Sequence, residues 1–148
     1  MKFTVSSADL LKKLQIAGGA IGSNAVIPIL EDFHFSISNN LLRIAATDLE
    51  TTITTSIEVN SDKDGDIAVP AKILIDTLKA LPEQPITLVV NEDNNNIEIT
   101  SAYGRYSLAG NNPDDFPSLP SPESIERIEL SEKIIANAIS KTLFATSN

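Results

Sequence analysis

The sequence predicts an α+β fold in which a β-α-β-β-β unit occurs twice. Short segments that alternate apolar and polar residues are typical of half-buried antiparallel strands. Two other segments carry apolar residues at helical spacing. Each helical segment follows one strand and precedes three more, so residues 1–59 and 66–110 share one order of elements. We interpret this order as an internal duplication at the level of secondary structure.

The first unit contains four predicted strands. Lys2–Val5 is short and rich in β-forming residues. Asp32–Ser38 alternates Phe and Ile with polar residues, which indicates one buried and one solvated face. The Asn39-Asn40 pair favours a turn because asparagine tolerates left-handed backbone. Leu41–Ala46 and Thr51–Val59 complete the set.

The second unit repeats this plan after a polar loop at Asn60–Asp66. Ile67–Val69 is its first predicted strand. Ile86–Val90 and Asn96–Thr100 flank a polar turn, and Arg105–Ala109 follows as the last strand. The similarity between the two units therefore lies in their elements, since few residues are identical.

One helix is predicted in each unit, and each has one apolar face. The first spans Ser7–Ile21, and Ser6 or Ser7 can cap it. The second begins at Pro70, a residue favoured at the first helical position, and ends at Pro82. Their apolar faces comprise Leu10, Leu11, Leu14, Ala17 and Ile21 in the first helix, and Ala71, Leu74, Ile75, Leu78 and Leu81 in the second.

A second domain begins near the end of the chain. Residues 111–126 contain four prolines among Ser, Asp and Glu, a composition typical of a linker. A strand at Arg127–Leu130 and a helix at Ser131–Ala145 then repeat the opening of the chain. They are too short to bury a core of their own, for which about 40 residues are the practical minimum. We expect a complete domain at 1–118, a linker at 119–126, and a truncated second domain at 127–148.

Composition excludes several classes of protein. Hydrophobic residues make up 42% of the 148 residues, which is enough for a packed core, and no cysteine is present. Disulfides, thiolate nucleophiles and cysteine-based metal sites are therefore excluded. No apolar run has the length of a signal peptide or of a membrane span. A cytoplasmic protein with no membrane partner is the simplest interpretation.

No catalytic constellation is recognisable. The single histidine, His34, lies on the polar face of a predicted strand without a neighbouring base or ligand. Common hydrolase, nucleotide-binding and zinc-protease motifs are absent. The acidic loops at Asp62–Asp66 and Asn91–Glu98 lack the spacing of a calcium-binding loop. We predict no catalytic residue, no metal site and no cofactor.

Charge is unevenly distributed along the chain. The formal net charge is −9, which by itself argues against nucleic-acid binding. The three predicted helices nevertheless carry six lysines and three acidic residues, whereas the remainder carries five basic and seventeen acidic residues. Lysines on a groove-facing surface bind DNA through counterion release, and acidic groups beyond about 8 Å are largely screened. Ordinary amphipathic surface is the alternative explanation.

A second candidate surface lies at a strand edge. Ile73 and Thr77 are on the flank of the second helix, away from its main apolar face. The last strand presents Tyr106 and Leu108. If that strand ends its sheet, it leaves unpaired backbone beside an apolar flank, a combination that proteins protect or use for pairing. Plain core packing is the alternative.

Five segments together resemble the N-terminal part of the bacterial sliding clamp family, the beta subunit of DNA polymerase III. They are Met1–Val5, Ile27–Leu30, Thr47–Glu50, Val69–Ala71 and Asp115–Pro117, in the family's order and at nearly its spacing. The resemblance covers the whole chain. It implies a DNA clamp-type domain with antiparallel sheets outside and two helices lining a central pore. Three such domains form a subunit, and two subunits form a head-to-tail homodimer ring.

The resemblance also implies site residues. The pore wall would carry Lys12, Lys13, Lys72 and Lys79, and Asn24 occupies a position where the family often has a DNA-contacting arginine. The ring contact of this domain would use Ile73, Thr77, Leu81, Tyr106 and Leu108. The groove that binds peptides of the polymerase and of the clamp loader lies in later domains.

The function implied is that of a non-catalytic processivity factor. The ring would encircle duplex DNA without sequence preference, slide along it and tether DNA polymerase III. Without the third domain, the chain alone is expected to be a monomer. The alternative is an acidic α+β protein-interaction module that does not bind DNA, but it does not explain why the repeat begins again at Arg127.

Overall fold

The computed structural model describes residues 1–22, 27–119 and 129–146. It divides into two compact units, Met1–Ser118 and Leu119–Asn148. None of the described helices is long and apolar enough to cross a membrane. The first unit contains the complete fold and both candidate surfaces.

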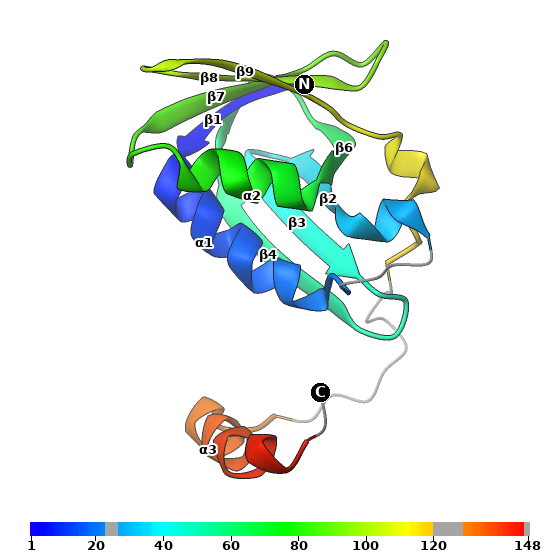
Figure 1. The fold of residues 1–148 in the computed structure, drawn as a ribbon, viewed down its shortest axis with the longest axis vertical. Helices are drawn as coiled ribbons and strands as arrows, with labels where there is room; N and C mark the ends of the chain where they lie inside the picture. Colours follow the sequence, from blue (N-terminus) through cyan, green and yellow to red (C-terminus); the bar gives the residue numbers. More distant parts are fainter. Residues whose placement is uncertain (23–26, 120–128, 147–148) are drawn as a thin grey trace. The chain divides into compact units, whose positions relative to one another are not determined.

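The first half of this unit runs from a strand into a helix and then into an antiparallel meander (Figure 1). Its elements are β1 (Lys2–Ser6), α1 (Ser7–Ala17), the 3-10 turns η1 (Gly18–Ala20) and η2 (Pro28–Glu31), β2 (Asp32–Ser38), β3 (Leu41–Thr47) and β4 (Thr52–Glu58). The meander follows from two turn residues with positive φ, Asn39 at 51° and Asn40 at 61°. The sequence-based prediction of a turn at this pair is confirmed.

The second half repeats the order. After the two-residue strand β5 (Asn60–Ser61) come β6 (Gly65–Pro70), α2 (Ala71–Lys79), β7 (Pro85–Val90), β8 (Asn96–Ser101), β9 (Gly104–Ala109) and the 3-10 turn η3 (Pro113–Asp115). All the strands predicted for the two units are therefore present. Only β5, which pairs with β1, lies in a segment predicted to be a loop, because two residues are too few to show a period.

The two β-α-β-β-β units that form Met1–Ser118 exchange their first strands. One sheet has the order β5-β1-β7-β8-β9 and the other has the order β4-β3-β2-β6. Phe3 of the first unit thus lies opposite Leu88 of the second, and Ile67 of the second lies opposite Phe35 of the first. Neither unit can form its sheet alone, so the duplication produces one cooperative domain.

The core lies between the sheets and the two helices. The largest fully buried side chains come from both halves of the chain: Phe3, Phe33, Phe35, Leu10, Leu14, Leu42, Ile44, Ile67, Leu74, Leu78, Ile86 and Leu88. The core is therefore aliphatic apart from three phenylalanines. Burying a side chain of this size contributes roughly 1.5–3 kcal/mol, so these residues fix which face of each helix is hidden.

The helices α1 and α2 lie side by side and antiparallel (Figure 1). The start of α1 is attached to the segment between α2 and β7, because the Ser7 amide donates to the Gln84 carbonyl at 2.9 Å. The Ser7 hydroxyl donates to the Pro82 carbonyl and accepts from the Gln84 amide, both at 3.1 Å. Ser6, the other predicted cap, is the N-cap, and its hydroxyl accepts from the Asp9 amide.

Both helices are shorter than the sequence predicts. The α-helical part of α1 ends at Ala17, where the chain continues as a 3-10 turn through two glycines, which are poor helix formers. Pro70 belongs to β6 and is the N-cap of α2, so the first α-helical residue is Ala71.

The second compact unit, Leu119–Asn148, contains α3 (Glu132–Thr142) and the 3-10 turn η5 (Leu143–Ala145). Its apolar residues are exposed, with Ile139 at 54% and Leu143 at 62%. Of the strand predicted at Arg127–Leu130, the first two residues lie outside the described residues, and Glu129 and Leu130 are not in a strand. A strand needs a neighbour for its backbone hydrogen bonds, and no described strand pairs with these two residues.

Candidate nucleic-acid interface

Each of the two helices presents an outward stripe opposite its buried face. On α1, the stripe consists of Asp9, Lys12 and Ile16, which are three and four positions apart and exposed. The Lys12 ammonium lies 3.4 Å from the Asp9 carboxylate, and their side chains are 73% and 56% exposed. Both side chains are therefore exposed to a ligand approaching the helix.

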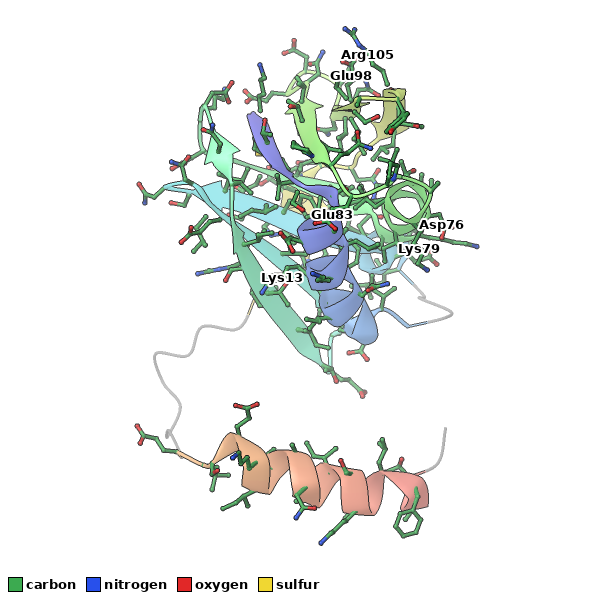
Figure 2. The ribbon with its side chains drawn as sticks, turned by 90° about the vertical axis from the view of Figure 1, so that its left-hand side faces the viewer. Lys13, Asp76, Lys79, Glu83, Glu98 and Arg105 are labelled. Atoms are coloured by element: carbon green, nitrogen blue, oxygen red, sulfur yellow. The ribbon has the colours of Figure 1, made fainter. Side chains whose placement is uncertain are left out.

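The outward stripe of α2 is built in the same way. It consists of Lys72, Asp76 and Lys79, again four and three positions apart, and all three are exposed. Figure 2 shows Asp76 and Lys79 projecting from the same side of α2. Of the predicted DNA-facing lysines, Lys12, Lys72 and Lys79 are therefore on the two outward stripes.

Lys13 has a different environment. It is partly buried, and its carbonyl accepts a hydrogen bond from the Thr55 hydroxyl of β4 at 3.3 Å. Figure 2 shows Lys13 on the side of α1 that faces away from α2. A rotation of about 100° per residue separates it from the stripe of Lys12. Asn24, the remaining predicted contact, lies outside the described residues.

The strand β9 forms one edge of the five-stranded sheet. In register, Tyr106 lies opposite Ile99, and Leu108 lies opposite Ile97. Both side chains are thus on the inner face of the sheet, but their exposures differ: Tyr106 is 37% exposed and Leu108 is 6% exposed. The Leu108 side chain packs into the domain's own core and is little exposed on this chain, and its role in the ring contact stays a prediction.

The predicted contact residues on α2 also differ in burial. Ile73 is 55% exposed, whereas Leu81 is partly buried and packs against the core. Thr77 is partly buried, and its hydroxyl donates to the Ile73 carbonyl at 2.8 Å. The apolar side chains among these predicted contacts that remain exposed are therefore Ile73 on α2 and Tyr106 on β9.

The duplication creates a second, equivalent edge that the sequence did not indicate. The paired residues can be followed across each sheet, strand by strand, from the exchanged strand to the opposite edge. In this register, Thr55 of β4 occupies the position in its sheet that Tyr106 of β9 occupies in the other. β4 likewise ends its sheet. The two edges differ in chemistry, because the Thr55 hydroxyl is bonded to α1 whereas the Tyr106 side chain is partly exposed.

A groove of about 730 Å³ lies where α1 ends beside the start of α2. Gly18 and Ile21 line one side, and Ala71 and Ile75 line the other. Asp32 reaches this groove and accepts a hydrogen bond from the Asn111 amide at 2.7 Å.

Among the groups with shifted pKa values, Asp32, His34 and Glu92 differ in the cause of the shift. Burial raises the pKa of the Asp32 carboxyl, although the hydrogen bond from Asn111 counteracts this rise. Burial lowers the pKa of His34, and the nearby Asp66 carboxylate partly offsets that effect. Hydrogen bonds from Lys63 and from the chain's N-terminal ammonium lower the pKa of Glu92 to about 2. None of these groups lies on the outward stripes, and among the described residues no three potential ligands cluster as a metal site would require.

The chain matches the model of the DNA polymerase III beta subunit, N-terminal domain, over residues 1–120. It is 32% identical to a beta sliding clamp of Vibrio harveyi over 146 residues, which are 98% of this chain and all of that relative. It is also 32% identical to the beta sliding clamp of Vibrio cholerae, covering all of this chain but only 40% of that protein.

Solved structures agree with this match. The sliding clamp from Caulobacter crescentus superposes with a TM-score of 0.89 at 30% identity, over all of this chain and 40% of that one. The clamp from Bacillus subtilis superposes with a TM-score of 0.91 at 26% identity, over all of this chain and 41% of that one. The DNA clamp-type fold predicted from the sequence is confirmed, and the chain belongs to the DNA polymerase III beta subunit family, whose N-terminal domain it contains.

Proposed function

We propose that this chain is the N-terminal part of a processivity factor, a ring that encircles duplex DNA and tethers the replicative polymerase. The observation that carries the proposal is the pair of antiparallel helices whose outward stripes bear Lys12, Lys72 and Lys79. Because the sheets occupy the opposite side of these helices, the lysines form a wall that a duplex can run along. The printed names of the relatives, beta sliding clamps, support the same role.

The lysine wall suits a protein that stays on DNA because its ring encloses the duplex better than one that stays by direct affinity. Three exposed lysines neutralise few phosphates, and such contacts carry no sequence information. Binding of this kind weakens steeply with salt. A protein with this surface stays on DNA only if the ring closes around the duplex. The ring acts in the cytoplasm on the chromosome, and its role is non-catalytic.

Ring closure would use the β9 edge. Its backbone is available for pairing, and exposed apolar surface is supplied by Tyr106 on β9 and Ile73 on α2. A head-to-tail contact joins two different surfaces, so the partner surface is on a domain beyond this chain. The chain alone therefore sediments as a monomer. The polymerase and the clamp loader bind mainly to those other domains.

The decisive experiment uses the full-length subunit and its clamp loader on a nicked circular plasmid. Gel filtration is performed before and after the plasmid is cut at one site. Retention on the circle and loss from the linear form is the expected result, because an unbroken ring can leave only over a free end. Equal retention on both forms would show that direct affinity holds the protein, and the proposal would be rejected.

A further inference from the structure

The outward stripes of α1 and α2 carry acidic residues among the lysines. Asp9 lies beside Lys12 on α1, and Asp76 lies between Lys72 and Lys79 on α2. Three lysines and two aspartates leave a net charge of only +1 on the surface that faces the proposed duplex. A surface selected for tight DNA binding alone would not place a carboxylate within one helical turn of each lysine.

The acidic groups are close enough to act on their neighbours. The Asp9 carboxylate lies 3.4 Å from the Lys12 ammonium. Side chains three or four residues apart on a helix have Cβ atoms about 5–6 Å apart, so Asp76 is within reach of both of its lysines. These separations are shorter than the Debye length of about 8 Å at physiological salt, so solvent ions screen them incompletely. A phosphate that approaches these lysines also meets the aspartates.

Neither carboxylate is needed to build the fold. The Ser6 hydroxyl bonds the backbone amide of Asp9 and leaves its side chain unused for capping. Among the described residues, the Asp76 side chain makes no hydrogen bond or ion pair, and the Asp76 carbonyl accepts a hydrogen bond from the Ala80 amide. Both aspartates are exposed. Their amide counterparts should therefore leave the helices in place.

We propose that Asp9 and Asp76 act as restraining charges that lower the affinity of this face for DNA phosphates and keep the ring mobile on the duplex. The proposal rests on the proposed function and adds a role for residues that do not attract DNA. Weak contacts dissociate quickly, so a closed ring can move past each phosphate without a stable bound state. Retention remains the task of the closed ring.

The test measures binding of the chain to a labelled duplex of about 20 base pairs by fluorescence anisotropy across a salt series. The double variant Asp9→Asn, Asp76→Asn is expected to bind about tenfold more tightly at low salt. The slope of log K against log salt should steepen by about 1 to 2, since each additional effective phosphate contact contributes about 0.9. Circular dichroism confirms that the variant is folded.

The matched control is the double variant Glu58→Gln, Asp93→Asn, which changes the net charge by the same amount. Glu58 is on β4 and Asp93 is in the turn after β7, and both are exposed away from the two stripes. Its affinity should change less than twofold. An equal gain in both double variants would show that only net charge matters, and the proposal would be overturned.

A third comparison separates this proposal from the proposed function. Adding Lys79→Gln to the Asp9→Asn, Asp76→Asn variant should remove most of the gain, because the same face then loses a cation. If the aspartate variant shows no gain while Lys12→Gln and Lys79→Gln weaken binding, the DNA-facing wall stands and the restraint fails. If the lysine variants also have no effect, the outward stripes do not contact DNA, and the DNA-facing wall fails together with the restraint.

Discussion

The ring of Phe116 lies against the imidazole of His34, with ring centroids 5.2 Å apart and planes inclined by 31°. Phe116 is 7% exposed and follows the last 3-10 turn of the first unit, so it fastens the outgoing chain to the outer face of β2. The Asn111–Ala68 bridge and the hydrogen bond from Asn111 to Asp32 attach the same segment just before this 3-10 turn. This segment therefore contributes to the stability of the domain and is more than a passive connection.

Replacing Phe116 with Ala should lower the free energy of unfolding by about 3 kcal/mol, because a buried aromatic side chain is lost and a cavity remains beside His34. Urea denaturation of the chain measures the change. Phe144→Ala is the matched control, since Phe144 is 87% exposed in the second unit and should change stability by less than about 0.5 kcal/mol. A small effect at Phe116 would show that the outgoing segment is not fastened in solution.

The stability of the domain should decrease as the pH falls below about 6.5. Burial lowers the pKa of His34 in the folded state, so the unfolded chain binds a proton at a higher pH than the folded chain does. The stabilisation is complete above the unfolded pKa and is lost as the pH falls toward the folded pKa. Asp66, 4.0 Å from the imidazole, moderates the effect.

Unfolding free energies measured from pH 7.5 to pH 5 check this prediction. His34→Gln is the comparison, because it removes the titrating group and should flatten the profile in this window. The carboxyl of Asp32 has a raised pKa and contributes in the opposite direction at lower pH, but it contributes equally in both proteins. Identical slopes for the two proteins would exclude His34 as the cause.

Gly110 marks the place where the chain passes from one sheet to the other. A Cβ at this position would lie 2.8 Å from the Asn95 carbonyl oxygen and 2.9 Å from that of Ala68, both backbone atoms that cannot move independently. Gly110→Ala should therefore destabilise the domain by about 1–3 kcal/mol through overpacking. Gly22→Ala is the control, because a Cβ there meets nothing within 4 Å. Thermal unfolding of the two variants gives the comparison, and equal midpoints would contradict the close approach.

Sequence periodicity was sufficient to predict the elements of the fold. The alternation in Asp32–Ser38 follows directly from burial, since Phe33, Phe35 and Ile37 are each at most 2% exposed. The buried faces of the helices could be predicted equally well, because Leu74 and Leu78 are fully buried and lie four residues apart. Local patterns of this kind depend only on which side of an element meets the core.

Strand partners and edge exposure could not be predicted in the same way. Alternation shows which face of a strand is buried but not which strand lies beside it, so the exchange of β1 and β6 between the units left no local pattern. The side chains of Tyr106 and Leu108 share a face, and the sequence could not show that only Leu108 is covered. Lys12 and Lys13 are adjacent in sequence, yet only the helical rotation places Lys13 beside β4.

The difference between Tyr106 and Leu108 gives the sharpest test of the β9 edge. Leu108→Asp should unfold the isolated chain, because it buries an unpaired charge in the core, whereas Tyr106→Asp should leave the chain folded. In the full-length subunit, Tyr106→Asp should weaken the dimer at least tenfold by placing a charge in an apolar contact. Circular dichroism of the chain and sedimentation of the full-length subunit measure the two effects. An unchanged dimer constant for Tyr106→Asp, together with an intact fold, would mean that the ring closes on a surface other than β9.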